Sequence, residues 1–464
     1  MPRAFVVILS AAKDLGSWRA KASSRHEPRS FVAPLLRMTS DNRATPHSFL
    51  PTPRSIAVTN TAADIPGVPA RVAELFSPGL RDLLVGLRRD LHRHPELSFR
   101  EERTAARLCE AIEVIGADRL ARLERVAGTG VVARVRGRDA RAPTVAVRGD
   151  IDALPIHEST GLPFSSVNDG VMHACGHDVH ATWAVGAAHL LAERPAAGDV
   201  VIVLQPAEEA GNGALAMIEG GALDGVRAIF GGHVDRRFPV GQVVADTGPL
   251  AAAADTFAIE LVGRGAHGAR PHEAADPVVG AAALVTALQT IVARRLDPAT
   301  PAVVTVATLH AGTAHNVIPE RATLGGTLRS TNPATRRLLH DEVRRIAEGV
   351  AAAHGLTADV RLDLGPPPVV NAAAPAAWAR RAAVSLLGED GVVPFGMVNM
   401  GAEDFAEYLE RVPGCFLRVG AREPGGDVIP AHTPRFYAAE ESVFVGAAVL
   451  AECARVASEA LSTT

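Results

Sequence analysis

Residues 199–209 read DVVIVLQPAEE, a short apolar run that ends in a loop with two adjacent glutamates. Two further stretches have the same form, TVAVRGD at 144–150 and VRAIFGGH at 226–233. Each has the length and the β-branched content of a buried strand, and helical stretches such as 181–194 lie between them. This alternation of strand and helix predicts an α/β fold whose sheet is mainly parallel.

Side chains with acid–base or metal-binding chemistry follow each of these strands. Asp150 ends the first strand, Glu208 and Glu209 follow the second, and His233 follows the third. In an open α/β sheet, ligands bind at the carboxyl ends of the strands. We therefore expect these side chains, although distant in the sequence, to converge on one site.

The stretch HACGHDVH at 173–180 adds the side chains that indicate a metal. Cys175 and His177 can bind as thiolate and imidazole, and His432 offers a further nitrogen. The adjacent glutamates can divide metal binding and proton transfer between them. Taken alone, C-x-H is more often a buried structural cysteine, and adjacent glutamates are more often a solvated pair. Their combination after apolar strands favours a metal site.

The length of 464 residues exceeds what one compact core contains and indicates two domains. Residues 249–365 have the pattern βαββαβ, which is the order of a ferredoxin-like domain. The expected elements are the strands 255–263, 302–310, 321–330 and 357–363 and the helices 276–296 and 333–355. Because 398–409 return to the style of the first segment, we expect an inserted domain at 249–365 within a catalytic domain formed by 76–248 and 366–464.

The composition of the chain indicates which environments and which classes of partner are compatible with it. Charged residues are 21% and hydrophobic residues 47%, and no apolar run approaches the roughly 18 residues of a membrane span, so we expect no membrane association. The net charge of −4 combines a basic segment 1–54 with an acidic remainder, which argues against a nucleic-acid partner. The four cysteines lack disulfide spacing, and a metal-binding thiolate is best kept reduced, so we expect a cytoplasmic location. Residues 1–75 lack sustained periodicity and are expected to be disordered or to result from an over-extended gene start.

Over roughly residues 76–460 the chain resembles the M20 metallopeptidase family, in its amidohydrolase branch of N-acyl-amino-acid amidohydrolases (aminoacylases), hippurate hydrolases and auxin-conjugate hydrolases. The motifs that carry this resemblance are LHRHPELSFRE at 91–101, RGDIDALPI at 148–156, GVMHACGHDVH at 170–180, QPAEE at 205–209, GHVD at 232–235, GRGAHGARPHEAADP at 263–277, HNVIPERATLGGTLR at 315–329, MGAEDF at 400–405 and AHTP at 431–434. The resemblance implies a metallopeptidase domain whose inserted ferredoxin-like domain serves as a dimerisation and lid domain.

The resemblance also implies roles for individual residues. Two divalent metal ions, which can be Zn, Mn or Co, are held by five ligands. The ligands fall on Cys175, His177, Glu209, His233 and His432. Glu208 falls on the general base, which takes a proton from the activated water and passes it to the leaving amine. His267 falls on a histidine that stabilises the oxyanion from a neighbouring subunit, which implies a homodimer or a higher homo-oligomer. Asn316 and Arg329 fall on positions that hold the substrate carboxylate.

One feature differs from many members of the wider clan, which have H-x-D after the first strand. This chain has DID at 150–152, so the ligand set must depend on Cys175, as in the amidohydrolase branch. Asp152 is then expected to orient a metal ligand. His180 lies one helical turn after His177 and is either a structural histidine or a supporting or substrate contact, with the structural interpretation slightly favoured.

Three functions are compatible with these residues. The first is a metal-dependent amidohydrolase that cleaves an acetyl, benzoyl or similar acyl group from a small-molecule N-acyl amino acid. The second is a dipeptidase or carboxypeptidase with the same chemistry. The third is a non-catalytic binding or dimerisation protein on this fold. Loss of a metal ligand or of the general base would favour that interpretation, but the five ligands and the base are all present in the sequence. The resemblance favours the first.

Overall fold

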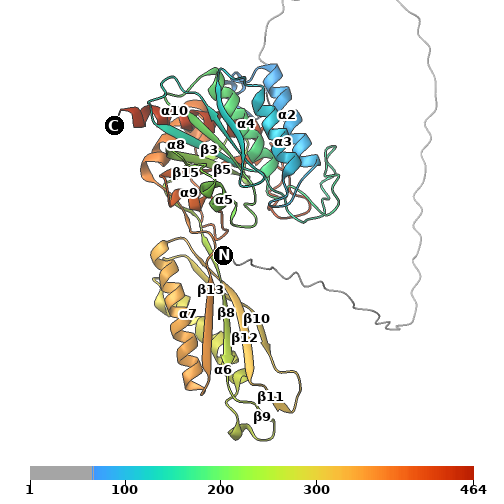
Figure 1. Ribbon diagram of the computed structural model, residues 1–464, viewed down its shortest axis with the longest axis vertical. Coiled ribbons are helices and arrows are strands. Elements are labelled where there is room, and N and C mark those ends of the chain that lie inside the picture. Colours follow the sequence, from blue (N-terminus) through green and yellow to red (C-terminus); the bar gives the residue numbers. More distant parts are fainter. Residues whose placement is uncertain (1–64, 66, 464) are drawn as a thin grey trace, which may run out of the picture. The chain divides into compact units, whose positions relative to one another are not determined.

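The structure is a computed structural model that describes residues 65 and 67–463. Its largest sheet has seven strands in the order β1-β2-β4-β3-β5-β15-β6 (Figure 1). The four central strands are parallel to one another. They are β4 (Val200–Gln205), β3 (Thr144–Asp150), β5 (Val226–Pro239) and β15 (Gly414–Arg422). Antiparallel strands complete the edges, and these are β1 (Leu120–Val126), β2 (Gly130–Val135) and β6 (Val243–Val244). The α/β class and the parallel centre agree with the sequence prediction, which did not include the antiparallel edges.

Helices cover both faces of this sheet, as the side chains of β4 show. Ile202 and Leu204 belong to a core shared with α2, α3, α4, α8 and α10, whereas Val201 and Val203 belong to a second core with α5 and α9. The bounds are α2 (Pro78–Arg93), α3 (Glu102–Glu113), α4 (His177–Glu193), α5 (Gly213–Glu219), α8 (Ala373–Leu387), α9 (Ala406–Leu409) and α10 (Ser442–Ser462). Helix α4 contacts α2 and α10 and is buried along nearly its whole length, which agrees with its central apolar stretch WAVGAA at 183–188.

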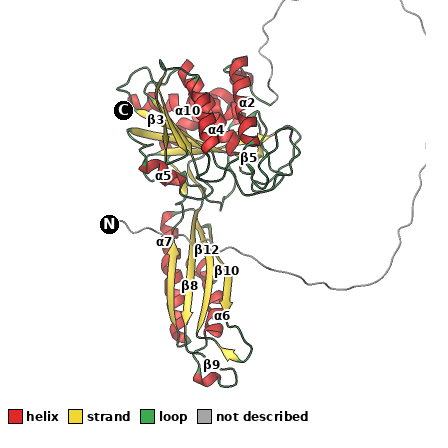
Figure 2. Cartoon of the chain, turned by 45° about the vertical axis from the view of Figure 1, so that its right-hand side comes forward, coloured by secondary structure: helices red, strands yellow, loops and turns green. Residues whose placement is uncertain are grey.

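A second, antiparallel sheet is built entirely from residues 253–363 and has the order β10-β12-β8-β13. Its elements are β8 (Ala253–Val262), α6 (Pro277–Leu288), β10 (Ala302–Ala311), β12 (Arg321–Ser330), α7 (Pro333–Ala353) and β13 (Thr357–Asp363). Both helices pack on the strands around a third core (Figure 2). The order βαββαβ is the one that the sequence predicts. All described residues fall in one compact unit, so the division into two domains at 249 and 365 stays a prediction.

Short elements complete the chain. The strands β7 (Gly248–Ala251) and β14 (Val369–Asn371) pair with each other, so the chain enters and leaves the second sheet through neighbouring strands. The strands β9 (Ala266–His267) and β11 (Val317–Ile318) form another pair. Single turns of 3-10 or π-helix are η1 (Pro271–Glu273), η2 (Ile291–Arg295) and η3 (Glu389–Gly391).

The predicted extension at 1–75 lies mostly outside the described residues. Near the end of this segment, residues Ala70–Ala73 form the short helix α1, and Val72 is buried in the core. The packed structure therefore includes residues that precede the expected start at 76. No helix in the described ranges is long and apolar enough to cross a membrane.

Candidate metal centre and active site

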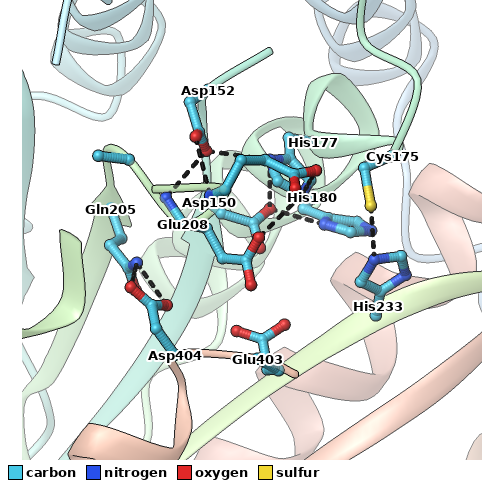
Figure 3. A network of polar contacts seen from close by, with 12 residues as sticks. Asp150, Asp152, Cys175, His177, His180, Gln205, Glu208, His233, Glu403 and Asp404 are labelled. Carbon is cyan, nitrogen blue, oxygen red and sulfur yellow. Dashed lines mark hydrogen bonds and ion pairs between the residues drawn. The ribbon is translucent and has the colours of Figure 1, made fainter. Parts of the chain in front are cut away.

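Cys175 lies in a tight loop before α4, and Gly176 allows the chain to turn there. Gly176 has a φ of 89°, and a Cβ atom on it would lie 2.5 Å from Val234 Cγ2. Only glycine fits such a position without strain. The close approach to β5 places Cys175 Sγ 3.1 Å from Nε2 of His233 (Figure 3).

Asp152 organises the centre by binding groups from two loops. Its Oδ1 lies 3.1 Å from His177 Nδ1 and accepts the N–H of Glu208 at 3.1 Å, while its Oδ2 accepts the N–H of Glu209 at 3.1 Å. The Ser98 hydroxyl also donates to Oδ2, at 2.7 Å. Asp152 therefore contacts two ligand candidates, His177 through its ring and Glu209 through its backbone. Because Nδ1 of that ring donates, its Nε2 lone pair is left for a metal.

His180 has both ring nitrogens engaged by the protein. Its Nδ1 lies 2.6 Å from Asp150 Oδ1, and its Nε2 accepts the N–H of Val234 at 2.9 Å. The ring also stacks on Trp183 at a centroid distance of 4.5 Å. These contacts fix β5 next to His233 and leave no ring nitrogen for a substrate contact.

His233 and His432 approach Cys175 from different elements. His233 Nδ1 donates to its neighbour Val234 O at 2.7 Å, which leaves Nε2 as the free lone pair. His432 has a φ of 61°, in the left-handed region that non-glycine residues rarely adopt, and its N–H donates to Ala174 O at 2.8 Å. This backbone conformation brings His432 Nε2 to 3.3 Å from Cys175 Sγ.

Two sets of donor atoms share the sulfur of Cys175. One set is Cys175, His177 and His233, and the other is Cys175, Glu209 and His432, with the atoms of each set within 4.8 Å of one another. His432 Nε2 lies 3.2 Å from Glu209 Oε1. His177 Nε2 is buried and has no hydrogen-bond partner among the described residues, and the buried Glu209 Oε1 has ion-pair contacts with histidine nitrogens only. Orphaned buried donors and acceptors are costly, and a cation in each set would satisfy them, so these residues fit two divalent metal ions.

The negative charges around the site favour the binding of cations. Burial, reinforced by the charge of Glu209, raises the pKa of the Cys175 thiol well above its usual range. Burial also raises the pKa of Glu208, together with the negative charges of Glu403 and Asp404. Nearby dications favour the ionised forms of such groups. Metal binding would therefore remove the unfavourable accumulation of negative charge.

Arg148 is a functional candidate that the sequence interpretation missed. Its guanidinium is fully buried and binds Gln205 Oε1 at 2.8 Å, Glu403 Oε1 at 3.0 Å, Asp404 Oδ1 at 3.1 Å and the Asp150 carboxylate. It thus links the acids of the MGAEDF motif to the strand end that supports His180. The signal was an arginine inside the apolar strand TVAVRGD, since a buried cation requires anionic partners.

One cavity of about 490 Å³ contains most of these groups. Its lining includes Cys175, Glu208, Glu209, His233, Arg329, Asn399, Glu403, Asp404, Arg418 and His432. Of the predicted substrate contacts, only Arg329 lines it. The other two, His267 on β9 and Asn316 directly before β11, lie close together. Gly268 N donates to Asn316 O at 2.7 Å, and Val317 pairs with His267. Asn399 and Arg418 were not singled out from the sequence.

Comparisons with known proteins agree with this geometry. The model of peptidase family M20/M25/M40 matches residues 146–456. The chain is 39% identical to the N-acetylcysteine deacetylase of Bacillus subtilis, over 82% of this chain and 97% of that protein, and 35% identical to thermostable carboxypeptidase 1 of Saccharolobus solfataricus, over 79% and 93%. The crystal structure of the Bacillus subtilis YXEP protein, described as a dinuclear metal-binding peptidase from the M20 family, superposes with a TM-score of 0.73 at 36% identity, covering 82% of this chain and 99% of that one. The chain therefore belongs to the M20 peptidase family.

Proposed function

We propose that this protein is a metal-dependent amidohydrolase that hydrolyses the amide bond of N-acyl amino acids, with an acetyl, benzoyl or similar acyl group. The observation that carries the proposal is the pair of donor sets that share Cys175 beside Glu208, all of whose members except His177 line one cavity. Similarity to an N-acetylcysteine deacetylase over nearly its full length supports this substrate class.

The proposed ligands are held ready for two ions, for which Zn, Mn and Co are the candidates. When bound, such ions polarise a carbonyl and lower the pKa of water from about 15.7 towards 7. The protein contributes orientation, because Asp152 fixes Nδ1 of His177 and a backbone carbonyl fixes Nδ1 of His233. Glu209 and His432 complete the second set.

Glu208 is the proposed general base. It is absent from both sets that share Cys175, yet its Oε2 lies 3.9 Å from His177 Nε2. Its backbone N–H donates to Asp152, which holds this part of the loop beside the donor atoms. In its role as base, Glu208 removes a proton from the attacking water and delivers it to the leaving amine nitrogen.

Substrate recognition in this proposal involves more than one chain. Arg329 lines the cavity, and its forked guanidinium suits the α-carboxylate of the amino acid. His267 accepts the N–H of Ala269 on Nδ1 at 3.1 Å, so its neutral ring carries the hydrogen on Nε2 and can donate to an oxyanion. Since His267 and Asn316 do not line this cavity, we infer that they complete the site of a second subunit in a homodimer. A cytoplasmic location, which keeps Cys175 reduced, is part of the proposal.

The second candidate is a carboxypeptidase or dipeptidase, which the similarity to thermostable carboxypeptidase 1 favours. A dipeptide would present a free α-amine that needs an acidic partner. The remaining acids of the cavity, Glu403 and Asp404, are both bonded to Arg148. Their engagement argues for an uncharged acyl nitrogen in the substrate.

The test is a hydrolysis panel with the metal-loaded protein. N-acetyl, N-benzoyl and indole-acyl amino acids are compared with dipeptides at equal concentration, before and after chelation and with Zn, Mn or Co restored. We expect the N-acyl compounds to have the higher kcat/KM and the activity to disappear on chelation. Faster turnover of dipeptides would replace the proposal with the second candidate, and full activity after complete metal removal would end both.

A further inference from the structure

Arg418 is a buried guanidinium without an anionic partner among the described residues. It lies on β15, paired in register with His233 on β5, and only 8% of its surface is exposed. Its Nε has no hydrogen-bond partner, and no hydrogen bond or ion pair within the described part of the chain reaches its guanidinium. Its neighbours are the rings of Phe395 and Phe416, with centroids 5.8 and 5.7 Å from Cζ.

This isolation is unusual among the buried arginines of the described residues. The three others that are buried to this degree each bind a carboxylate. The pairs are Arg88 with Asp178, Arg148 with Glu403 and Arg236 with Glu423, at nitrogen–oxygen distances of 2.9, 3.0 and 2.8 Å. Arginine stays protonated in proteins, and an unpaired buried charge is strongly unfavourable. A position with that cost is expected to have a compensating anion when the protein works.

The acids nearest to Arg418 are already engaged. Both oxygens of the Asp235 carboxylate accept hydrogen bonds from Arg237 Nε, at 2.9 and 3.1 Å. Glu403 Oε1 accepts from Arg148 and from a backbone N–H. Both carboxylates are therefore held by other groups of the described residues, and a bound ligand can supply the anion for Arg418.

The cavity shows where that anion enters. Arg418 lines the same cavity as Cys175, His233 and Arg329. If Arg329 takes the α-carboxylate, a second arginine in the cavity exceeds what a simple N-acyl amino acid requires. A planar guanidinium recognises a carboxylate through two parallel hydrogen bonds.

We propose that Arg418 binds a second carboxylate of the substrate, so that the preferred substrates are N-acyl amino acids with a further acidic group. This inference rests on the proposed amidohydrolase function. The second carboxylate belongs either to the side chain of the amino acid or to a dicarboxylic acyl group. Both sources present the same chemistry to Arg418, and isosteric substrate pairs distinguish them.

The kinetic experiment compares each acid with its neutral amide in the metal-loaded enzyme. N-acetyl-L-glutamate is paired with N-acetyl-L-glutamine, and N-succinyl-L-alanine with the terminal amide of its succinyl group. We expect one pair to favour the acid in kcat/KM by about 10-fold or more, the value of a charge-assisted hydrogen bond. Arg418→Gln should abolish that ratio, and Arg418→Lys should retain part of it. The matched control is Arg422→Gln, on the same strand but outside the cavity lining, which should retain the ratio.

A binding experiment separates recognition from turnover. In the metal-loaded Glu208→Gln protein, calorimetry should give tighter binding of the acid than of its amide, and adding Arg418→Gln should remove the difference. Equal binding of acid and amide by the protein with Arg418 intact would overturn the proposal. An Arg418→Gln variant whose affinity for acid and for amide falls by the same factor would also overturn it. If no N-acyl amino acid is hydrolysed but the binding difference persists, the proposed function fails while the role of Arg418 as an anion receptor stands.

Discussion

At the level of single residues, the proposed function gives the two adjacent glutamates different tasks, Glu208 as general base and Glu209 as metal ligand. Glu209 shares a donor set with Cys175 and His432, Glu208 shares one with Glu403 and Asp404, and both glutamates share a third with His177. This difference arises although both N–H groups bind the same aspartate, because successive residues direct their side chains differently. An exchange of one carboxylate for an amide should therefore affect either turnover or metal content.

We predict that the Glu208→Gln protein keeps its metal content, whereas its kcat falls by a factor of about 10² to 10⁴, as expected when a general base is removed. The matched control is Glu209→Gln, which should lower the metal content measured by elemental analysis after dialysis. Activity and metal are measured on the same preparations. Metal loss in Glu208→Gln with metal retained in Glu209→Gln would show that the two assignments are exchanged.

The predictability of the site differs from residue to residue. The strand-end argument anticipated that Glu208, Glu209 and His233 would converge, and they do lie around one cavity. The contacts of Asp152 could not be predicted, since its partners come from loops whose backbone direction only the folded chain defines. Arg418 was missed because an arginine in GCFLRVGAR resembles a half-exposed strand residue until its neighbours are known.

The loop between β3 and α4 is secured by a charged network. Glu158 accepts the N–H of Ser166 at 2.6 Å and lies 3.3 Å from His92 Nε2, while His92 Nδ1 lies 2.9 Å from Asp178 Oδ2 on α4. Although burial opposes it, hydrogen bonds from His92, Thr160 and Ser166 lower the pKa of Glu158 to about 2. The loop is thus connected to the helix that begins at His177.

The pH dependence of this network follows from the lowered pKa. A carboxyl group with a lowered folded-state pKa stabilises the fold above its unfolded value of about 4.3, and this contribution is lost as the pH falls towards the folded value. We predict that Glu158→Gln lowers the free energy of unfolding by about 1–2 kcal/mol at pH 7, after allowance for solvent screening. The difference from wild type should shrink below pH 4.5.

Urea unfolding of the chelated protein between pH 3.5 and 8 measures this effect. The exposed Glu110, which pairs with Arg107 on the surface of α3, provides the control. Glu110→Gln should change the free energy of unfolding little at any pH. A Glu158→Gln difference that does not vary with pH would assign the residue to packing and not to charge.

The elements themselves were predictable to different degrees. Apolar runs identified the central strands and the βαββαβ order, because burial imposes a pattern on each segment separately. Pairing direction is not encoded in such a pattern, and β2 pairs antiparallel with both of its neighbours. The predicted helix 276–296 ends at Leu288 and is followed by the π-helical turn Ile291–Arg295, which apolar periodicity alone did not distinguish from a continuous helix.

Assembly is the question at the scale of the whole molecule. His267 is exposed and does not line the cavity of its own chain. We predict that His267→Ala and Glu208→Ala are each inactive and that mixing them restores activity. In a mixed dimer one site combines the intact Glu208 of one chain with the intact His267 of the other, so random exchange should restore about a quarter of the sites.

Subunit exchange is promoted by mild denaturation and renaturation of an equimolar mixture, followed by an assay on the N-acyl substrate of the panel. Each variant treated alone is the control for refolding. Activity no greater than the sum of the two controls would place the whole reaction within one chain. Recovery near the expected fraction would support completion of the site by a second subunit.

The sulfur shared by both donor sets makes the centre vulnerable at a single atom. Alkylation or oxidation of Cys175 would leave neither set with its three donors, so one modified thiol per chain would empty both positions together. Bound ions would shield this sulfur from reagents. Because burial raises the pKa of the metal-free thiol, chelated protein stored in air should slowly lose the capacity to be reactivated near pH 7 and lose it faster as the pH rises, whereas metal-loaded protein should keep it.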